Sequence, residues 1–364
     1  MPTTARFLIL IPAHDEEETI QATVESCRAI EYDQSQFAVC VIADNCSDGT
    51  ALVAREAGAE VVERVNLVKR SKGYALEYFF ERGPLSEYDA VVIVDADTVV
   101  DPGILQSFAS GLAKGWDWIQ CYHTVRNADA SWRTRVMTYA FSLFNGVRPM
   151  GFEQLGLGAA FNGNGMCFST SGLARVPWRA YSLAEDLEFS WTLRLAGERI
   201  HFEPHVRVLA DMLTRGGSAA SAQRRRWEVG RTALRRRVLG PLLRSHNIGP
   251  FRKGLYVIEL FFPPLSVLFA ALLLAASVHL VAVLDPRLLP LSRLLRPAHA
   301  VMAATLMAYT LSPLLVMRLP VRYLASLLAL PYFMGWKTTV ALGRRPSMWV
   351  RTWREPSCRS PGSG

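Results

Sequence analysis

The chain has 364 residues, of which half are hydrophobic and only a fifth are charged. This composition excludes a fully disordered chain, because disorder requires low hydrophobicity and high charge. A plain soluble enzyme is also a poor fit, because residues 260–284 and 297–317 contain no charged side chain. Each run is long enough to cross a bilayer as a helix. We therefore expect a membrane protein with a large water-facing part ahead of its anchor.

The N-terminal segment and the cysteines both indicate that the first domain lies in the cytoplasm. The apolar run near the N-terminus has only six residues and is followed by acids, which is too short for the core of a signal peptide. The six cysteines form no C-x-x-C pair and show no zinc spacing, so we expect buried, reduced thiols.

Strand-like and helix-like segments alternate over the first 210 residues. The predicted strands are Phe7–Ile11, Phe37–Ala43, Val61–Val65 and Ala90–Val94, and the predicted helices are Glu17–Ala29, Thr50–Ala57 and Lys72–Glu81. This alternation predicts an α/β domain with a mostly parallel sheet. In such sheets, ligands bind beyond the carboxyl ends of the strands.

Three of these strand ends carry carboxylates. They are Pro12-Ala13-His14-Asp15-Glu16, Asp44-Asn45-Cys46-Ser47-Asp48-Gly49 and Asp95-Ala96-Asp97. Because alternate side chains of an extended backbone share a face, Asp95 and Asp97 can converge on one point. Hard oxygen ligands suit Mg²⁺ or Mn²⁺. A turn that caps the next helix is the simpler interpretation, but the neighbouring acidic strand ends favour a metal.

Two further positions have both a functional and a structural interpretation. Asp44 can accept a hydrogen bond from a nucleotide base or cap the helix that starts at Thr50, although Asp48 is the better cap. Lys72, beside Gly73 at a predicted helix start, can meet a phosphate or can be a solvated surface lysine.

We predict that Glu185 and Asp186 begin a helix and that most of the apolar residues of this helix are buried. Acids in the first turn can stabilise the helix dipole. One of them can instead be a general base for a sugar hydroxyl. The residues alone leave these two interpretations nearly even.

The segment Gln223-Arg224-Arg225-Arg226-Trp227 lies in an Arg-rich stretch just before the first apolar run. On a helix, Gln223, Arg226 and Trp227 share one face, whereas Arg224 and Arg225 point elsewhere. Such a face can stack a sugar and pair with a phosphate. Alternatively, the arginines and the tryptophan contact the membrane surface and its anionic lipids. Nucleic acid is not an expected partner, since no recognisable nucleic-acid fold accompanies the stretch.

Together, these ordered motifs resemble the membrane-associated family 2 glycosyltransferases with a GT-A fold, over about residues 6–230. The family includes cellulose, hyaluronan and poly-N-acetylglucosamine synthases and ceramide glucosyltransferases. The resemblance implies a Rossmann-like nucleotide-sugar-binding domain followed by an α-helical membrane anchor.

The resemblance also implies roles for single residues. Pro12, Glu16 and Asp44 would hold the base and ribose, Lys72 the base or diphosphate, Asp95 the nucleotide and the metal, and Asp97 the metal. Asp186, paired with Glu185, would be the general base. Gln223, Arg226 and Trp227 would close over the diphosphate, with Trp227 also lining the acceptor site beside Asn164 and Gly165 of the loop 161–166. Two positions depart from the family pattern, namely Asp15, where Asn is usual, and Ala184, where Thr is frequent.

We therefore expect an inverting glycosyltransferase that uses a nucleotide-sugar, in the first place a UDP-sugar, with Mg²⁺ or Mn²⁺. The expected acceptor is a growing polysaccharide. The alternatives are transfer of one sugar to a membrane lipid and a non-catalytic adaptor that binds nucleotide or membrane. A transporter is disfavoured, because the apolar runs hold no ionisable residue beyond His279 and His299.

The expected organisation has four parts. Residues 1–215 form the cytoplasmic GT-A domain, 216–252 an amphipathic interface segment, 253–342 the membrane region and 343–364 a basic tail. The membrane region, 253–342, would contain two membrane-spanning helices, about 260–284 and 297–317, and an interfacial or re-entrant helix at about 321–342. The positive-inside rule favours a cytoplasmic C-terminus in a multi-pass protein of the plasma (inner) membrane. An oligomer or an export partner could complete a channel.

Overall fold

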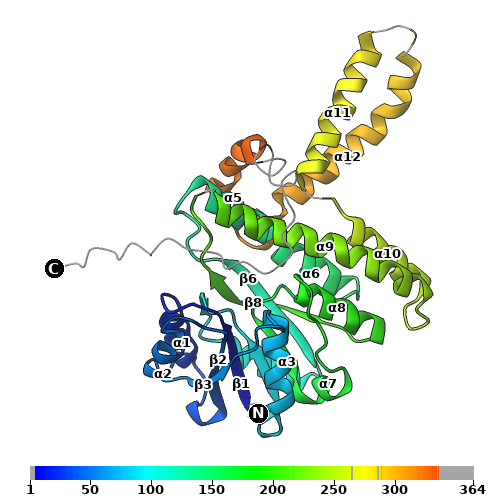
Figure 1. The fold of residues 1–364 in the computed structure, drawn as a ribbon. Coiled ribbons are helices and arrows are strands. Elements are labelled where there is room, and N and C mark those ends of the chain that lie inside the picture. Colours follow the sequence, from blue (N-terminus) through cyan, green and yellow to red (C-terminus); the bar gives the residue numbers. More distant parts are fainter. Residues whose placement is uncertain are drawn as a thin grey trace, which may run out of the picture.

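The computed structural model describes residues 5–215, 217–263, 265–284, 287, 289–333 and 335. Its centre is an eight-stranded sheet of order β3-β2-β1-β4-β7-β6-β8-β5 (Figure 1). The strands are β1 (Phe7–Ala13), β2 (Phe37–Asp44), β3 (Glu60–Arg64), β4 (Ala90–Ile93), β5 (Thr98–Val100), β6 (Trp118–Val125), β7 (Met166–Ser169) and β8 (His201–Ala210). The first four strands pair in parallel, whereas β7 runs antiparallel to β4 and β6.

Helices cover both faces of the sheet, because alternate side chains of each buried strand enter different cores. In β1, Phe7, Ile9 and Ile11 pack with α1 (Ile20–Arg28), α2 (Thr50–Glu56) and α4 (Ile104–Ala113). Leu8 and Leu10 face α3 (Lys72–Arg82), α7 (Thr170–Arg175) and α8 (Glu185–Ala196). The predicted α/β class is confirmed, although α1 begins three residues later than the predicted helix.

Two long helical segments connect this domain to the apolar C-terminal part. The first consists of α5 (Trp132–Phe141), a π-helical turn (Ser142–Val147) and α6 (Arg148–Gln154). The second is α9 (Ser218–Arg244), which lies across the domain above the sheet (Figure 1). Helix α10 (Pro250–Phe261) follows α9, and both helices share an apolar core with α8.

A buried ion pair fixes α10 to α8. Arg194 Nη1 lies 2.9 Å from Glu259 Oε2, and the two side chains are only 2% and 8% exposed. Arg148 contacts the other oxygen of Glu259 at 3.1 Å. Helix α10 is therefore part of the packed domain.

Helices α11 (Leu265–Leu284) and α12 (Leu289–Val316) form a hairpin that projects from the rest of the molecule (Figure 1). Both are long and apolar enough to cross a membrane. Only 6% of the apolar stretch Val267–Leu284 in α11 and 17% of the stretch Ser292–Val316 in α12 are buried. The first apolar run was expected to form one helix from residue 260. Instead, the chain leaves helical geometry at Phe262 and Pro263, so Leu260 belongs to α10.

The third apolar stretch folds back onto α5. Its first part forms a short 3-10 helix (Val321–Ala329), in which Arg322 pairs with Asp129 at 2.8 Å. The rings of Tyr332 and Trp132 are 5.3 Å apart. Residues 336–342 and the predicted tail 343–364 lie outside the described residues.

Candidate functional site

The D-A-D turn lies where two parallel strands end side by side. Leu10 of β1 is in register with Ile93 of β4, and the turn follows β4 directly. Asp95 and Asp97 flank the buried Ala96 in a turn and not in the extended backbone that was expected, so the convergence of their carboxylates on one point stays a prediction. Lys72 at the start of α3 places its Nζ 2.5 Å from Asp95 Oδ1. The turn therefore carries a carboxylate paired with an ammonium group and a second carboxylate two residues later.

Gly73 explains how Lys72 reaches this position. A Cβ atom on Gly73 would lie 2.1 Å from the carbonyl oxygen of Ala180. The same backbone approach lets Trp178 Nε1 donate a hydrogen bond of 3.0 Å to the carbonyl of Gly73. Only glycine permits this packing, so the Lys-Gly pair brings the first turn of α3 against the segment before α8.

The loop between α6 and β7 holds the D-A-D turn and Lys72 in place through hydrogen bonds. Lys72 also donates to the carbonyl of Gly163. The Asn164 side chain is fully buried, with Oδ1 accepting from the Asp95 N–H at 3.1 Å and Nδ2 donating to Thr98 Oγ1 at 2.8 Å. A Cβ on Gly165 would lie 2.3 Å from Cys121 Sγ. In the structure, Asn164 and Gly165 hold the loop in place, and their contact with an acceptor stays a prediction.

Asp186, the second residue of α8, faces the same loop. The Cβ position of Gly163 lies 3.4 Å from Asp186 Oδ2 and 4.0 Å from Lys72 Nζ. Leu187 N–H donates to Asp186 Oδ1 at 2.8 Å. Burial and the neighbouring charge of Glu185 raise the pKa of Asp186 to about 7. A carboxylate with this pKa can take up a proton near neutral pH.

Helix α9 closes over the start of α8 at a glycine. A Cβ on Gly230 would lie 2.9 Å from Cβ of Ala184, so α9 passes directly beside the residue that precedes Glu185. The next residue, Arg231, acts on Asp186 and lowers its pKa, against the larger effect of burial. Sequence reasoning missed Arg231, although it lies four residues after Trp227 and therefore on an adjacent turn.

The structure agrees only in part with the predicted orientation of the side chains on α9. Trp227 packs against the cluster that includes Met137, Met212 and Phe333. Arg224, which was expected to point away from the site, is only 21% exposed and pairs with Glu228 at 3.1 Å. The difference arises because α9 is covered on more than one side. Gln223 and Arg226 are half-buried in the same turn, and their contact with a donor stays a prediction.

Asp44 is held by a partner that the sequence did not reveal. The carboxylate forms an ion pair with the buried guanidinium of Arg64, its partner in the register between β2 and β3. Asn45 Nδ2 donates to Asp44 Oδ1 at 2.9 Å. Burial raises the pKa of Asp44, and Arg64 opposes this effect. Knowledge of the strand register would have been needed to find Arg64.

Pro12 and Glu16 lie on the neighbouring strand end. Pro12 is in register with Ile42 of β2. The Glu16 N–H donates to Thr50 Oγ1 at 2.8 Å, and Glu16 Oε2 accepts from Thr19 Oγ1 at 3.0 Å. Both residues are half-buried beside Asp44, and their predicted contact with a base and ribose remains a proposal.

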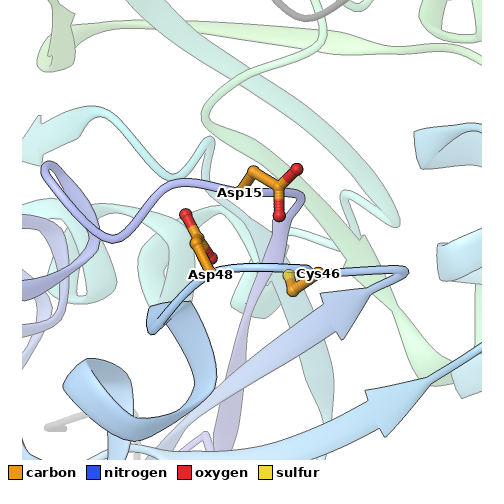
Figure 2. Close-up of side chains that lie close together, drawn as sticks. All are labelled: Asp15, Cys46 and Asp48. Atoms are coloured by element: carbon orange, nitrogen blue, oxygen red, sulfur yellow. The ribbon is translucent and has the colours of Figure 1, made fainter.

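Asp15, Cys46 and Asp48 gather where the loops after β1 and β2 meet (Figure 2), with their possible ligand atoms within 4.8 Å of one another. Asp15 Oδ1 accepts from the Ser47 N–H at 2.6 Å, and Asp48 Oδ1 accepts from the Thr50 N–H at 3.0 Å. Burial raises the pKa of Cys46 to about 11, so its thiol stays protonated. The group ties the two loops together, and Asp15 has this role where Asn is usual.

The chemistry of the two acidic groups differs with respect to a divalent cation. The D-A-D turn offers carboxylate oxygens from two half-exposed aspartates, which is the donor set that Mg²⁺ and Mn²⁺ prefer. The carboxylates of Asp15 and Asp48 are already occupied by backbone N–H groups, and the third member is a protonated thiol. Asp95 and Asp97 therefore fit the expected metal better. A separate groove of about 670 Å³, beside Glu77, Phe80 and Trp178, contains no strand-end carboxylate.

The sequence profile described as "Glycosyltransferase like family 2" matches residues 5–230. Among curated proteins, the glucomannan 4-beta-mannosyltransferase 7 of Arabidopsis thaliana is 24% identical over 277 residues, covering 70% of this chain and 48% of that protein. The poly-beta-1,6-N-acetyl-D-glucosamine synthase of Staphylococcus epidermidis is 29% identical over 231 residues, covering 61% and 53%. The chain thus spans about half the length of the curated relatives it matches.

The fold is similar to a solved structure as well. TarS 1–349 of Staphylococcus aureus, crystallised in complex with UDP-GlcNAc, superposes with a TM-score of 0.50 at 16% identity. The match covers 70% of this chain and 71% of that chain. This similarity shows the GT-A-like fold that the motifs predicted.

Proposed function

The chain belongs to the glycosyltransferase like family 2, and on this basis we propose that it transfers a sugar from a nucleotide-sugar to a membrane-proximal acceptor with inversion at the anomeric carbon. The observation that supports this most directly is the position of Asp186. Its carboxylate has a pKa raised to about 7 and lies beside Gly163, whose carbonyl accepts from Lys72, the ion-pair partner of Asp95.

The donor nucleotide would occupy the ends of β1 and β2. Pro12, Glu16 and Asp44 would contact the base and ribose, with Arg64 fixing the orientation of Asp44. A UDP-sugar is the proposed donor, and its uracil ring N–H would donate to the Asp44 carboxylate. Lys72 would meet the diphosphate while remaining close to Asp95.

Asp95 and Asp97 would hold Mg²⁺ or Mn²⁺. When bound, such a cation neutralises charge on the leaving diphosphate. Gln223 and Arg226 of α9 would close over the diphosphate from the other side. A guanidinium group pairs well with phosphate oxygens because its donors form a planar fork.

Asp186 would accept the proton of the acceptor hydroxyl as that oxygen attacks the anomeric carbon. Its Oδ1 already accepts from the Leu187 N–H, which leaves Oδ2, the oxygen nearer to Gly163, for the acceptor. Glu185 would keep the pKa of Asp186 high, and Arg231 would stabilise the carboxylate form. This balance keeps the base partly ionised near neutral pH.

A growing polysaccharide is the proposed acceptor, supported by the names of the curated relatives, which include a poly-beta-1,6-N-acetyl-D-glucosamine synthase. Trp227 would stack against its terminal sugar. A membrane lipid is the second candidate, because Trp227 packs with Phe333 of the third apolar stretch. If Trp227 lines the acceptor site, this contact would put the acceptor next to the third apolar stretch.

The proposed location is the plasma (inner) membrane, with the catalytic domain in the cytoplasm and α11 and α12 as two spans. The arginines of α9 and α10 would contact anionic lipids. An oligomer or an export partner would be required if a long product crosses the membrane through a channel.

The test uses the purified full-length protein with radiolabelled UDP-glucose, UDP-N-acetylglucosamine and GDP-mannose, in the presence of membrane lipids. Products are separated into lipid-soluble and polymeric fractions. Label in the polymer supports the proposed acceptor, and label in a lipid with one sugar supports the second candidate. The Asp186→Asn variant is the matched control. No transfer from any donor by the wild type would refute the proposal.

A further inference from the structure

Two buried polar atoms beside the site have no hydrogen-bond partner among the described residues. They are Nε2 of His123 and Nδ2 of Asn162. Buried side-chain nitrogens without a partner are uncommon in folded proteins, and each one calls for an explanation such as a catalytic role or a bound molecule. His123 belongs to none of the motifs that indicated the family, and Asn162 lies in the loop 161–166, of which only Asn164 and Gly165 were expected to line the acceptor site.

His123 lies on β6 and is 8% exposed. The charges of Asp95 and Lys72 both act on its imidazole, which also faces the backbone of Asn162. Phe141 packs edge-on against the ring, with 5.3 Å between the ring centroids, and Asn145 Nδ2 donates to the backbone carbonyl of His123 at 3.1 Å. The aromatic contact supports one side of the imidazole, and the hydrogen bond fixes the main chain of β6 at this residue.

Asn162 lies on the loop that joins the same groups. Its N–H donates to Gln120 Oε1 at 2.9 Å. The next residue, Gly163, accepts from Lys72 and lies beside Asp186. The two unpaired nitrogens therefore belong to neighbouring residues, because the His123 ring lies next to the Asn162 backbone, and both residues adjoin the part of the site that contains Lys72.

The chemistry of the pair matches a hydroxyl group. A neutral imidazole nitrogen can accept a hydrogen bond, an amide NH₂ donates, and a hydroxyl can do both at once. Burial lowers the pKa of His123 to about 4, so the ring is uncharged at neutral pH.

We propose that His123 and Asn162 form a pair that recognises one sugar hydroxyl at the point of transfer and thereby contributes to sugar specificity. This inference rests on the proposed function. The hydroxyl belongs either to the donor sugar or to the acceptor sugar, and the two sources differ in the step they affect.

The experiment uses the full chain with His123→Phe, which keeps a ring against Phe141, and Asn162→Asp, which removes the amide donor. His123→Gln is the conservative variant. Matched controls are His205→Phe and Asn247→Asp, at exposed positions. For each protein, kcat/KM is measured for donor hydrolysis without acceptor and for transfer to an oligosaccharide. The probes are UDP-glucose, UDP-N-acetylglucosamine and GDP-mannose. Binding of UDP and GDP alone is measured by calorimetry.

We expect about a tenfold fall in kcat/KM for His123→Phe and Asn162→Asp, the usual size of one lost hydrogen bond. Recognition of the donor sugar lowers hydrolysis and transfer together, and recognition of the acceptor lowers transfer alone. In both cases nucleotide affinity stays within about twofold of wild type, His123→Gln recovers part of the loss and the controls do not change.

Two results would refute the proposed role of His123 and Asn162. The first is a kcat/KM of the variants within about twofold of wild type in both reactions. The second is a loss of nucleotide affinity as large as the loss of kcat/KM, which indicates a merely structural role. An active wild type with unaffected variants overturns this inference alone. A wild type that binds neither nucleotide and turns over no donor overturns the proposed function and the pair with it.

Discussion

Lys72 Nζ lies 2.5 Å from Asp95 Oδ1, which joins the first turn of α3 to the end of β4. One carboxylate of the D-A-D turn is therefore paired with a cation of the chain itself. Asp95 also donates its N–H to the buried Asn164 side chain. Asp97 lies at the other end of the turn, where its Oδ1 accepts a long hydrogen bond of 3.3 Å from Thr98 Oγ1, and we expect it to be the primary ligand for a divalent cation.

The first prediction concerns this difference. Asp97→Asn should remove Mn²⁺-dependent turnover while the fold is preserved, because an amide oxygen is a weaker ligand for a hard cation. Activity is measured against Mn²⁺ concentration, and Mn²⁺ binding in the presence of UDP by electron paramagnetic resonance. Asp101→Asn, on the loop after β5, is a suitable control. Full activity of Asp97→Asn, or of the wild type in excess chelator, would contradict the metal assignment.

The second prediction concerns the pH dependence set by Asp186. Its pKa is raised to about 7, and a base must be deprotonated, so kcat should rise with pH through about 7 and then level off. Asp186→Asn should lose about 10²–10⁴-fold in kcat with UDP affinity unchanged. Turnover of this variant within a few-fold of wild type would move the role to another group.

The third prediction separates the faces of α9. Alanine at Arg226 or Trp227 should reduce activity much more than alanine at Arg225. Arg224 lies off the face that Arg226 and Trp227 share, but alanine at this position should also reduce activity because its side chain is largely buried. Initial rates of the single variants give the ranking. Equal losses across the segment would favour a purely interfacial role.

The fourth prediction concerns Arg231. Its positive charge lowers the pKa of Asp186, so Arg231→Gln should raise that pKa and move the rise of kcat to higher pH. Arg225→Gln, which also removes one charge from α9, is the matched control. An unchanged pH profile in Arg231→Gln would show that the two charges do not interact.

The fifth prediction tests the close approach at Gly73. Gly73→Ala places a methyl group 2.1 Å from the backbone oxygen of Ala180, so the helix must move. We expect a loss of about 1–3 kcal/mol of stability, the usual cost of overpacking, together with reduced activity. Gly254→Ala, in α10, meets no atom within 4 Å and should leave the melting temperature unchanged or higher. Equal melting temperatures for the two variants would contradict the contact.

The sequence was sufficient for the features that depend on local pattern. Alternating strands and helices predicted the sheet, and the acids after β1, β2 and β4 predicted its ligand edge. The partners of these acids were not predictable. Arg64 reaches Asp44 through the register of β3, and Arg231 reaches Asp186 only because Gly230 lets α9 approach Ala184. The first apolar helix was also predicted to start too early, because hydropathy alone does not reveal that the helix is broken at Pro263.

The ion pair between Arg194 and Glu259 has a consequence for dissecting the molecule. The family match ends at residue 230, which invites excision of a soluble fragment at that point. Such a fragment would lack Glu259 and leave the Arg194 guanidinium buried without its counter-charge. It would also lose Leu234, Val238 and Tyr256 from the core shared with Trp191. The smallest fragment that keeps these contacts therefore extends at least to Phe261, the last residue of α10 before the hairpin of α11 and α12.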